Sequence, residues 1–432
     1  MEQKKLLSLL PLGVFLALFL GTGVYFNSQG VDFAFYQLPS PVAAIAGIIV
    51  AFIILRGTLD EKMNTFIQGV GDSNIIIMCM IYLLAGGFAT VAKAMGGVDS
   101  VVNFGLSIIP PSLILPGLFV IASFVSTAMG TSMGTIAAVA PIAVDVALKA
   151  DLPLAIAVAA VVGGAMFGDD LSMISDTTIA ATRTQGCNLK DKFIMNFKIA
   201  LPAALVTLAI MVVFGVSGTV PSGLNYDVIK ILPYLAVLIL ALLGMNVFIV
   251  LVLGIVMAGA IGLIDGSFTL LGFTQKIYEG FGSMQEIFIL SLLIGGLAAM
   301  IAKAGGLDYL ISLICRRIKS RKGAELGIAA LVSLADICIA NNTVAIVVTG
   351  PMAKKIADEN GVDARWSASL LAIFSCVWQG IIPYGAQLLL AGSIAKLSPV
   401  SIMPHLYYPY LLGIIALAAI LIGFPRTSSN VS

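Results

Sequence analysis

The sequence predicts an all-α polytopic membrane protein built from two inverted-topology repeats, with about ten transmembrane helices, two re-entrant hairpins and two broken helices. Three observations predict this fold class: the composition, the number of long apolar runs, and a motif that recurs in each half. Of the 432 residues, 59% are hydrophobic and 10% are charged. Because an ordinary soluble domain has about 25% charged residues, a soluble protein is excluded.

The charge balance and the cysteines exclude several function classes. Lys and Arg number 23 and Asp and Glu 22, so the net charge is +1 and no basic surface for nucleic acid is expected. The 5 cysteines lie far apart without a C-x-x-C pair, and there is 1 histidine. This pattern argues against a structural zinc site and a disulfide framework. We therefore expect the partners to be the lipid bilayer and small ions, with no cofactor and no nucleic acid.

Continuous apolar runs of about 20 residues can each cross a bilayer as a helix, because a helix satisfies its own backbone groups. Candidates are 6–26, 38–55, 74–94, 199–216, 229–243, 245–263, 287–304 and 406–422. The first run follows Lys4 and Lys5 and lacks a small-residue cleavage pattern. It is therefore predicted to be the first span and not a signal peptide.

Four further apolar stretches are irregular. Residues 113–148 and 324–352 are too long for one crossing and have polar centres marked by Gly or Asn, which predicts two re-entrant hairpins. Residues 152–182 and 366–395 are interrupted by polar side chains, which predicts two broken helices. Irregular backbone is tolerated at membrane depth only where it lines a cavity or is buried in protein.

The distribution of Lys and Arg predicts the orientation, because cytoplasmic loops carry the excess of both residues. With the N- and C-termini cytoplasmic and both hairpins returning to their own side, the basic residues on the outer face are Lys93, Lys149, Lys230, Lys276 and Lys396. All the others, including Arg56, Lys192 and Lys303, then lie inside. We expect a multi-pass protein of the cell (inner or cytoplasmic) membrane.

The two halves carry the same pattern. Segment 86–97, which reads G-G-x8-G-G, recurs as 295–306 at an offset of 209. Pro141 matches Pro351 at 210, and Phe167-Gly168 matches Gln379-Gly380 at 212. The predicted orientation makes the copies face opposite sides, as in many secondary transporters. We assign residues 1–218 to repeat 1 and 219–432 to repeat 2. The glycine pairs themselves are explained by close helix packing.

The tip of the first hairpin is polar. Residues 130–135 read G-T-S-M-G-T between apolar arms. Thr131, Ser132 and Thr135 supply hydroxyl oxygens, and the glycines free backbone groups from helical pairing. This hard donor set suits an alkali cation or a substrate carboxylate. The alternative is that the hydroxyls bond back to their own helix.

The first broken span contains three acidic residues, Asp169, Asp170 and Asp176. A carboxylate inside the bilayer costs a few kcal/mol, so these should face a cavity, a counter-charge or a cation. Such a cluster can exchange a proton for a cation, because protonation removes the charge that attracts the ion. The alternative is that they lie at the cytoplasmic mouth and pair with Arg183 and Lys190 as ordinary solvated charges.

The second half has different chemistry at the corresponding places. Its candidate residues for a substrate or second ion are Asn341, Asn342, Thr343, Gln379, Tyr384 and Gln387. Amides and a phenol can orient a ligand but do not release a proton near neutral pH. Asp336, close to the second tip, is the exception and a second candidate carboxylate.

Two motifs resemble a known family. GTSMGT (130–135) with Pro141, followed by GDDLSMISDTT (168–178), resembles the paired signatures of the NhaC-type Na+/H+ antiporters. The whole length is similar to the YuiF-like branch of that family, in the ion transporter superfamily. The chain departs from it at Met133, where many relatives carry an aromatic residue, and at Met173, where many carry proline.

This resemblance implies a Na+-linked secondary transporter whose hairpin tips and broken helices form the site. The implied ion- and proton-binding residues are Thr131, Ser132, Thr135, Asp169, Asp170, Ser172, Ser175, Asp176 and Thr177. Na+ would lie at Asp169, Asp170, Thr131 and Ser132. Relatives of this branch have been associated with amino-acid uptake.

Three function classes follow from these residues. The leading one is exchange of Na+ for H+ at a buried Asp cluster by alternating access, without a covalent step. The second is Na+- or H+-coupled symport of an amino acid or small carboxylate, whose organic part the amides of the second half would bind. The third, a membrane-embedded Asp-dependent enzyme, needs further acidic ligands and leaves the repeat unexplained. A homodimer is compatible with all three.

Overall fold

The structure, a computed structural model, describes residues 7–29, 31, 37–108, 110–173, 175–213, 225–243, 245–306, 309, 318 and 320–424. Within these residues the regular secondary structure is entirely helical, which confirms the predicted all-α class. The predicted cytoplasmic positions Lys4, Lys5, Arg316, Arg317, Lys319 and Arg426 lie outside the described residues. So does the predicted repeat boundary at 218 and 219.

Each half has a similar order of helices. The first half contains α2 (Leu10–Ser28), α3 (Ser40–Ile54), α4 (Leu59–Val70), α5 (Ser73–Ala94), α6 (Gly97–Ile108), the 3-10 turn Pro111–Leu113, α7 (Ile114–Met129), α8 (Ser132–Lys149), α9 (Leu154–Leu171), α10 (Asp176–Gln185) and α11 (Leu189–Val213). The second contains α12 (Val228–Leu242), α13 (Val247–Ile264), α14 (Leu270–Ser283), α15 (Gln285–Lys303), α17 (Arg321–Ile339), α18 (Asn342–Asn360), α19 (Ala364–Ile381), α20 (Ala386–Ala395), α21 (Pro399–Ile402), the 3-10 turn Met403–His405 and α22 (Tyr407–Ile422).

The helix bounds give the offset between the halves. α9 and α19 begin and end 210 residues apart, and so do α10 and α20. α8 and α18 also begin 210 residues apart. The predicted offset of 212 at the broken span is therefore wrong: Gln379 corresponds to Asp169 and not to Phe167. The sequence match was misled because a glycine follows both Phe167 and Gln379.

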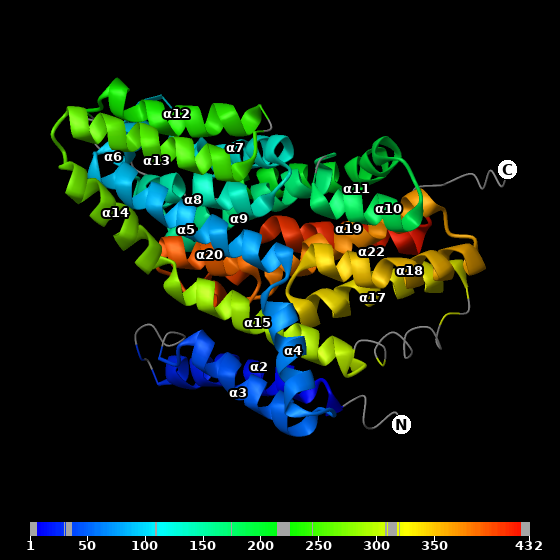
Figure 1. Cartoon of the computed structure of the whole chain (residues 1–432). Coiled ribbons are helices and arrows are strands. Elements are labelled where there is room, and N and C mark those ends of the chain that lie inside the picture. Colours follow the sequence, from blue (N-terminus) through cyan, green and yellow to red (C-terminus); the bar gives the residue numbers. More distant parts are fainter. Residues whose placement is uncertain are drawn as a thin grey trace.

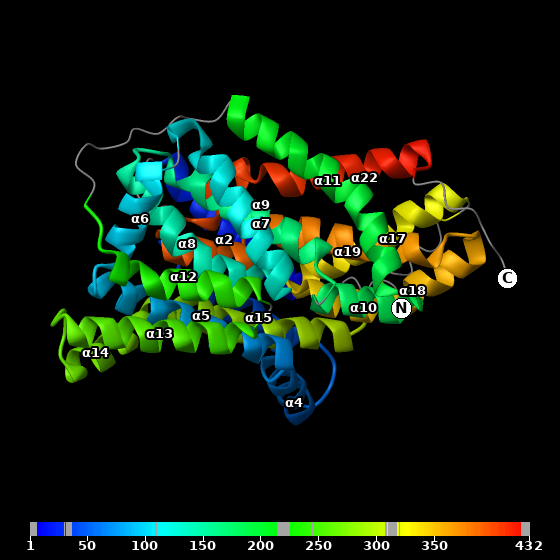
Figure 2. The ribbon, with the colours of Figure 1, turned by 90° about the horizontal axis from the view of Figure 1, so that it is seen from above.

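The two halves run in opposite directions and exchange contacts. In Figure 1, the chain passes from α9 to α10 toward the right, and from α19 to α20 toward the left. α10 packs on α18 of the other half, as both views show (Figures 1 and 2), and α20 packs on α8. The second part of each broken helix thus contacts the opposite hairpin, which holds all four elements together at their polar breaks.

Glycines allow a second reciprocal packing. α4 packs on α15, and α14 packs on α5. A Cβ at Gly69 would overlap the carbonyl oxygen of Gly295, and a Cβ at Gly86 would overlap that of Gly280. The explanation of the glycine pairs by close helix packing is therefore confirmed, because only a missing side chain permits this approach.

Helix length and composition identify the membrane segments. Five described helical segments are long and apolar enough to cross a membrane, and up to seven if the two bent pairs α14–α15 and α21–α22 each count as one. One of these, α8, is a hairpin arm. With the shorter apolar helices α2, α3, α12 and α13, the remaining segments correspond to the predicted crossings.

One predicted boundary is wrong. The span expected at 199–216 begins at Leu189, so α11 includes a polar stretch with Lys192 and Asn196. Both of these side chains are buried. Apolar periodicity could not show that they belong to the helix core, because their partners lie on other helices.

Candidate functional site

Each hairpin tip reverses the chain through one residue in the left-handed conformation. Gly130 (φ 70°) ends α7, and Thr131 caps α8 by accepting a hydrogen bond from the Gly134 amide at 3.4 Å. Ala340 (φ 54°) ends α17, and Asn341 caps α18 through the Val344 amide at 3.0 Å. Both tips therefore place a polar cap and a helix N-terminus at the same point of the fold.

Each broken helix is interrupted by extended backbone. α9 ends at Leu171, and Ser172 and Ser175 are extended before α10 begins. In the second half, Ile382 and Gly385 are extended between α19 and α20. These breaks release backbone amides and carbonyls from helical pairing, so they must be buried in protein or face a polar cavity.

The two tips and the two breaks meet around one cavity of about 80 Å³. Its lining residues are Ile77, Ile81, Gly130, Thr131, Ser132, Met133, Asp169, Ser175, Asp176, Thr177, Asn341, Asn342, Thr343, Gln379 and Gln387. Residues that are more than 200 positions apart in the sequence thus face the same space.

Asp169 is the buried carboxylate of this cavity, with a 6% exposed surface. The Ser132 hydroxyl donates to its Oδ2 at 2.8 Å, and the Ser175 hydroxyl donates to its Oδ1 at 2.6 Å. Ser175 Oγ also lies 2.7 Å from Thr177 Oγ1. One tip and one break therefore supply hydroxyls to a single carboxylate, and hydrogen bonds to a charged group are among the stronger ones.

The amides of the second half connect to this carboxylate. Gln379 Nε2 donates to Gln387 Oε1 at 2.7 Å and to the Ala340 carbonyl at 3.3 Å. Gln387 Nε2 donates to Ser132 Oγ at 3.1 Å. A side-chain chain of hydrogen bonds thus runs from the second broken helix to the first hairpin tip.

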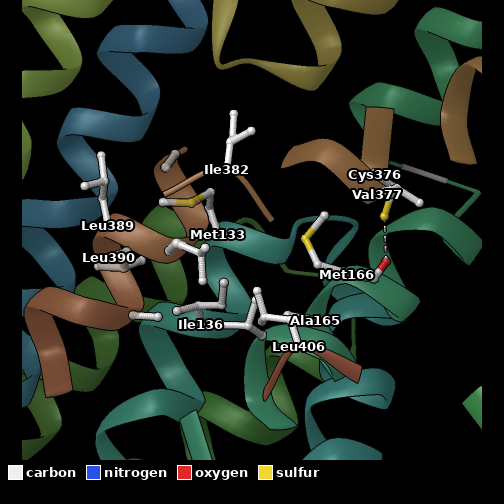
Figure 3. Close-up of a cluster of buried hydrophobic side chains, with 14 of the residues drawn as sticks. Met133, Ile136, Ala165, Met166, Cys376, Val377, Ile382, Leu389, Leu390 and Leu406 are labelled. Atoms are coloured by element: carbon white, nitrogen blue, oxygen red, sulfur yellow. Dashed lines mark hydrogen bonds between the residues drawn. The ribbon is translucent and has the colours of Figure 1, made fainter. Parts of the chain in front are cut away.

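An apolar cluster packs beside the polar residues. Figure 3 shows Met133 and Ile136 of α8, Met166 of α9, and Leu389 and Leu390 of α20 gathered there. The Cys376 thiol donates to the carbonyl of Met166 at 3.4 Å, and these two residues are equivalent in the two halves. This packing keeps the hydroxyls and the carboxylate in a water-poor setting, which strengthens their electrostatic interactions.

Asp170 lies outside the cavity, although it follows Asp169 directly. Its Oδ1 accepts a hydrogen bond from Asn196 Nδ2 at 2.8 Å, and Lys192 Nζ lies 3.9 Å from the same oxygen. Lys192 also donates to the Asp170 carbonyl and to Thr178 Oγ1. Because helical residues one position apart point in different directions, the two carboxylates have separate surroundings.

The remaining predicted residues divide in the same way. Thr177, Asp176, Asn341, Asn342 and Thr343 line the cavity, with Asp176 exposed. Thr135, Ser172, Asp336 and Tyr384 are buried outside the set of lining residues.

Two of these have identified partners. The Thr135 hydroxyl bonds back to the Thr131 carbonyl of its own helix at 2.9 Å. The Tyr384 hydroxyl donates to the Ile337 carbonyl at 2.6 Å. Both hydroxyls are therefore satisfied within the fold and do not face the cavity.

The sequence of the whole chain matches the family described as the Na+/H+ antiporter family, over residues 5–216 and 223–425. The chain belongs to the Na+/H+ antiporter family. It is accordingly a secondary transporter and a multi-pass membrane protein, and not an enzyme, as the sequence predicted.

Two relatives of this family member come from Bacillus subtilis. The Malate-2H(+)/Na(+)-lactate antiporter is 23% identical, covering 93% of this chain and 91% of the relative. The Na(+)/H(+) antiporter NhaC is 25% identical, covering 86% and 87%. The solved structure of the Alcanivorax borkumensis YdaH transporter is 14% identical, with a TM-score of 0.41 over 85% of this chain and 90% of that chain.

Sequence reasoning missed several residues of this antiporter-family site. Ile77 and Ile81 of α5 line the cavity, but an apolar pair in a transmembrane helix carries no local signal. Lys192 was predicted to lie in a cytoplasmic loop, yet it is 1% exposed and faces Asp170. The spacing of Lys192 and Asn196, four residues apart in a helix, was the available signal, because such residues share one face.

The donor set of this antiporter-family cavity suits a small hard cation. Its oxygens come from one buried carboxylate, from hydroxyls and from side-chain amides. Among the described residues, no group of three or more His, Cys, Asp or Glu could hold a metal ion together. The arrangement therefore favours a monovalent ion held by oxygens over a transition metal held by nitrogen and sulfur ligands.

Proposed function

We propose that this chain exchanges Na+ for H+ across the membrane by alternating access, and that Asp169 holds each ion in turn. The observation that carries the proposal is the position of Asp169. It is a buried carboxylate at the point where both hairpin tips and both helix breaks meet, with Ser132 and Ser175 on its two oxygens.

Competition for this carboxylate couples the two ions. A proton on Asp169 removes the negative charge that attracts Na+, and a bound Na+ disfavours protonation. The hydroxyls of Ser132 and Ser175 can rotate, so that each donates to a bare carboxylate or offers an oxygen lone pair to a cation. Na+ and H+ are thus the transported and coupling ions, and no cofactor takes part.

The cavity volume favours an ion over an organic solute in this conformation. About 80 Å³ accommodates a partly hydrated ion, since a water in the liquid takes about 30 Å³. Pockets for drug-sized molecules measure about 300 Å³ or more. Because Asp170 lies away from this cavity against Lys192, the proposal assigns Na+ to Asp169 without Asp170.

The decisive experiment is reconstitution of the purified chain in liposomes with an internal pH dye, followed by Na+ pulses. Asp169→Asn should abolish Na+-driven H+ movement, because the amide cannot take up a proton. Asp170→Asn, compared at equal amounts of folded protein, should keep the Na+ dependence of the flux. Wild-type exchange by Asp169→Asn would refute the assignment.

Coupled transport of an organic solute is the second candidate. Four amides, of Asn341, Asn342, Gln379 and Gln387, line the cavity, which is more than an ion alone requires. One relative is named as an antiporter of malate and lactate. The same vesicles should be tested with amino acids and with small carboxylates. Flux that requires one of these solutes would favour the second candidate, and flux on Na+ alone favours exchange.

We further infer that both termini are cytoplasmic. Lys303 Nζ donates to Thr65 Oγ1 at 2.8 Å, so the end of α15 and helix α4 lie on one side, where the distribution of charges predicts the cytoplasm. A protease site added at the C-terminus should be cleaved in inside-out membrane vesicles and protected in right-side-out ones. The reverse pattern would invert the orientation.

A further inference from the structure

A second cavity, distant from Asp169 in the fold, lies where α3 and α15 end beside α4 (Figure 1). Its volume is about 620 Å³, within the range of small-molecule sites. Its described lining residues are Leu7, Ser8, Ile54, Leu55, Arg56, Glu61, Lys62, Thr65, Met300, Lys303 and Ala304. The proposed exchange at Asp169 makes no use of them.

The charges of this cavity are mainly positive. Arg56, Lys62 and Lys303 come from three different segments, and Glu61 is the acidic residue among the described lining side chains. Glu61 accepts the Thr58 amide in the capping box of α4, so its carboxylate is directed to that helix end. Lys62 and Lys303 each donate one hydrogen bond, to the Phe52 carbonyl and to Thr65 Oγ1. Each ammonium has further hydrogens for an anion.

The position corresponds to the depth of lipid headgroups. α3 and α15 are apolar helices, and both end at this cavity, at Ile54 and Lys303. α4 carries an exposed apolar stripe of Leu59, Met63 and Ile67, spaced four residues apart on one face. Such a helix lies in the membrane interface with its apolar face toward the acyl chains. The cavity therefore adjoins both the apolar layer and the basic side chains.

We propose that this cavity binds the phosphate of an anionic phospholipid headgroup. Basic pockets between transmembrane helices attract anionic headgroups, and each Lys or Arg near the surface contributes about 1 kcal/mol. The apolar lining residues Leu7, Ile54 and Met300 suit the glycerol and acyl part, which a free phosphate ion lacks. This combination favours an amphiphile over a soluble anion.

A bound lipid would join the two halves of the chain. Arg56 and Lys62 belong to the first half, and Lys303 belongs to the second. The walls are held in fixed register, because Gly69 of α4 packs directly on Gly295 and Gly296 of α15. The lipid is expected to stabilise this α4–α15 contact.

The test measures the melting temperature of the detergent-solubilised chain during titration with phosphatidylglycerol, phosphatidylcholine or inorganic phosphate. Phosphatidylglycerol alone should raise the melting temperature. The double variant Arg56→Gln/Lys303→Gln should bind phosphatidylglycerol about 30-fold more weakly. Lys276→Gln, on the corresponding helix α14 and paired with Glu279, is the matched control and should bind as the wild type does.

A third variant guards against simple misfolding. Glu61→Gln removes the acidic charge but preserves the capping box, so it should fold and bind phosphatidylglycerol more tightly. Unchanged affinity in both Arg56→Gln/Lys303→Gln and Glu61→Gln would overturn the proposal. An equal effect of inorganic phosphate would show that the anion is soluble, and an equal effect of phosphatidylcholine would show that headgroup charge is irrelevant. Either result would overturn the lipid assignment.

Discussion

Asp169 and Gln379 occupy the same position in the two halves, 210 residues apart, and hydrogen bonds through Gln387 and Ser132 join them. Each precedes by two residues the end of the first part of a broken helix. One half thus has a carboxylate where the other has an amide. The repeat is symmetric in backbone but not in charge, so one half can exchange a proton while the other orients the partner groups.

The first prediction concerns this chain of hydrogen bonds. Ser132→Ala removes the donor to Asp169, and Gln387→Leu removes the donor to Ser132. We expect Ser132→Ala to weaken the apparent Na+ affinity about tenfold or more, because a hydrogen bond to a charged group is worth about 1.5–3 kcal/mol. Gln387→Leu should have a smaller effect. Na+ titration of H+ flux in liposomes measures both.

The double variant and a control test the same chain. Because the two residues act in series, Ser132→Ala/Gln387→Leu should be little worse than Ser132→Ala alone. Thr135→Val is the control, since its hydroxyl bonds to its own helix outside the cavity, and it should retain the Na+ affinity. Simple additivity of the two single effects would argue against the chain.

The second prediction concerns Lys192 and Asp170. Lys192→Met leaves the Asp170 carboxylate buried without a counter-charge, and removing one partner of a buried pair costs about 3–5 kcal/mol. The thermal stability in detergent should fall strongly. Lys192→Met/Asp170→Asn should recover much of the loss, because no uncompensated charge remains. A double variant that is as unstable as the single one would show that Lys192 acts by packing alone.

The third prediction concerns the contact between α4 and α15. Gly69→Ala places a Cβ against the Gly295 carbonyl oxygen and the Ala299 methyl, so the two helices must separate. We expect reduced yield and a lower melting temperature, by about 1–3 kcal/mol in stability. Gly117→Ala is the control, because nothing lies within 4 Å of its added Cβ. A melting temperature of Gly69→Ala equal to that of Gly117→Ala would contradict the packing.

The fourth prediction concerns the start of α19, at the edge of the membrane segment. Asp363 caps this helix through the Arg365 amide at 2.8 Å, and its Oδ2 lies 2.6 Å from Arg365 Nη2. These hydrogen bonds lower the pKa of Asp363. Asp363→Ala should cost about 1 kcal/mol through loss of the cap. Asp363→Asn keeps an oxygen for the cap and should cost less.

The pH dependence follows from the direction of this pKa shift. A lowered pKa in the folded state stabilises the protein above the ordinary carboxyl pKa, and this contribution is lost as the pH falls through the lowered value. The stability difference between the wild type and Asp363→Asn should therefore be present at neutral pH and shrink in acid. Thermal unfolding at a series of pH values measures it. A difference that grows in acid would reverse the assigned sign.

Particular residues show how far the sequence could lead. The polar tip at 130–135 and the interruptions at 152–182 and 366–395 were visible because polar residues are costly among apolar ones in a membrane. That Ser132, Asp169 and Gln387 contact one another was not visible, since they belong to a tip and two breaks that pack together only in the folded chain. The roles of Asp169 and Asp170 could not be separated either, because adjacent letters do not reveal opposite directions on a helix.

The sequence by itself determined the membrane-spanning helical class, the two related halves and the family. These depend on composition, apolar length and local motifs, and lipid imposes them on any chain of this kind. Only the tertiary structure decided that Asp169 faces the cavity while Asp170 faces Lys192, and that the basic residues Arg56, Lys62 and Lys303 share a second cavity. The physical reason is that side-chain surroundings are set by contacts between helices distant in sequence, which local pattern does not encode.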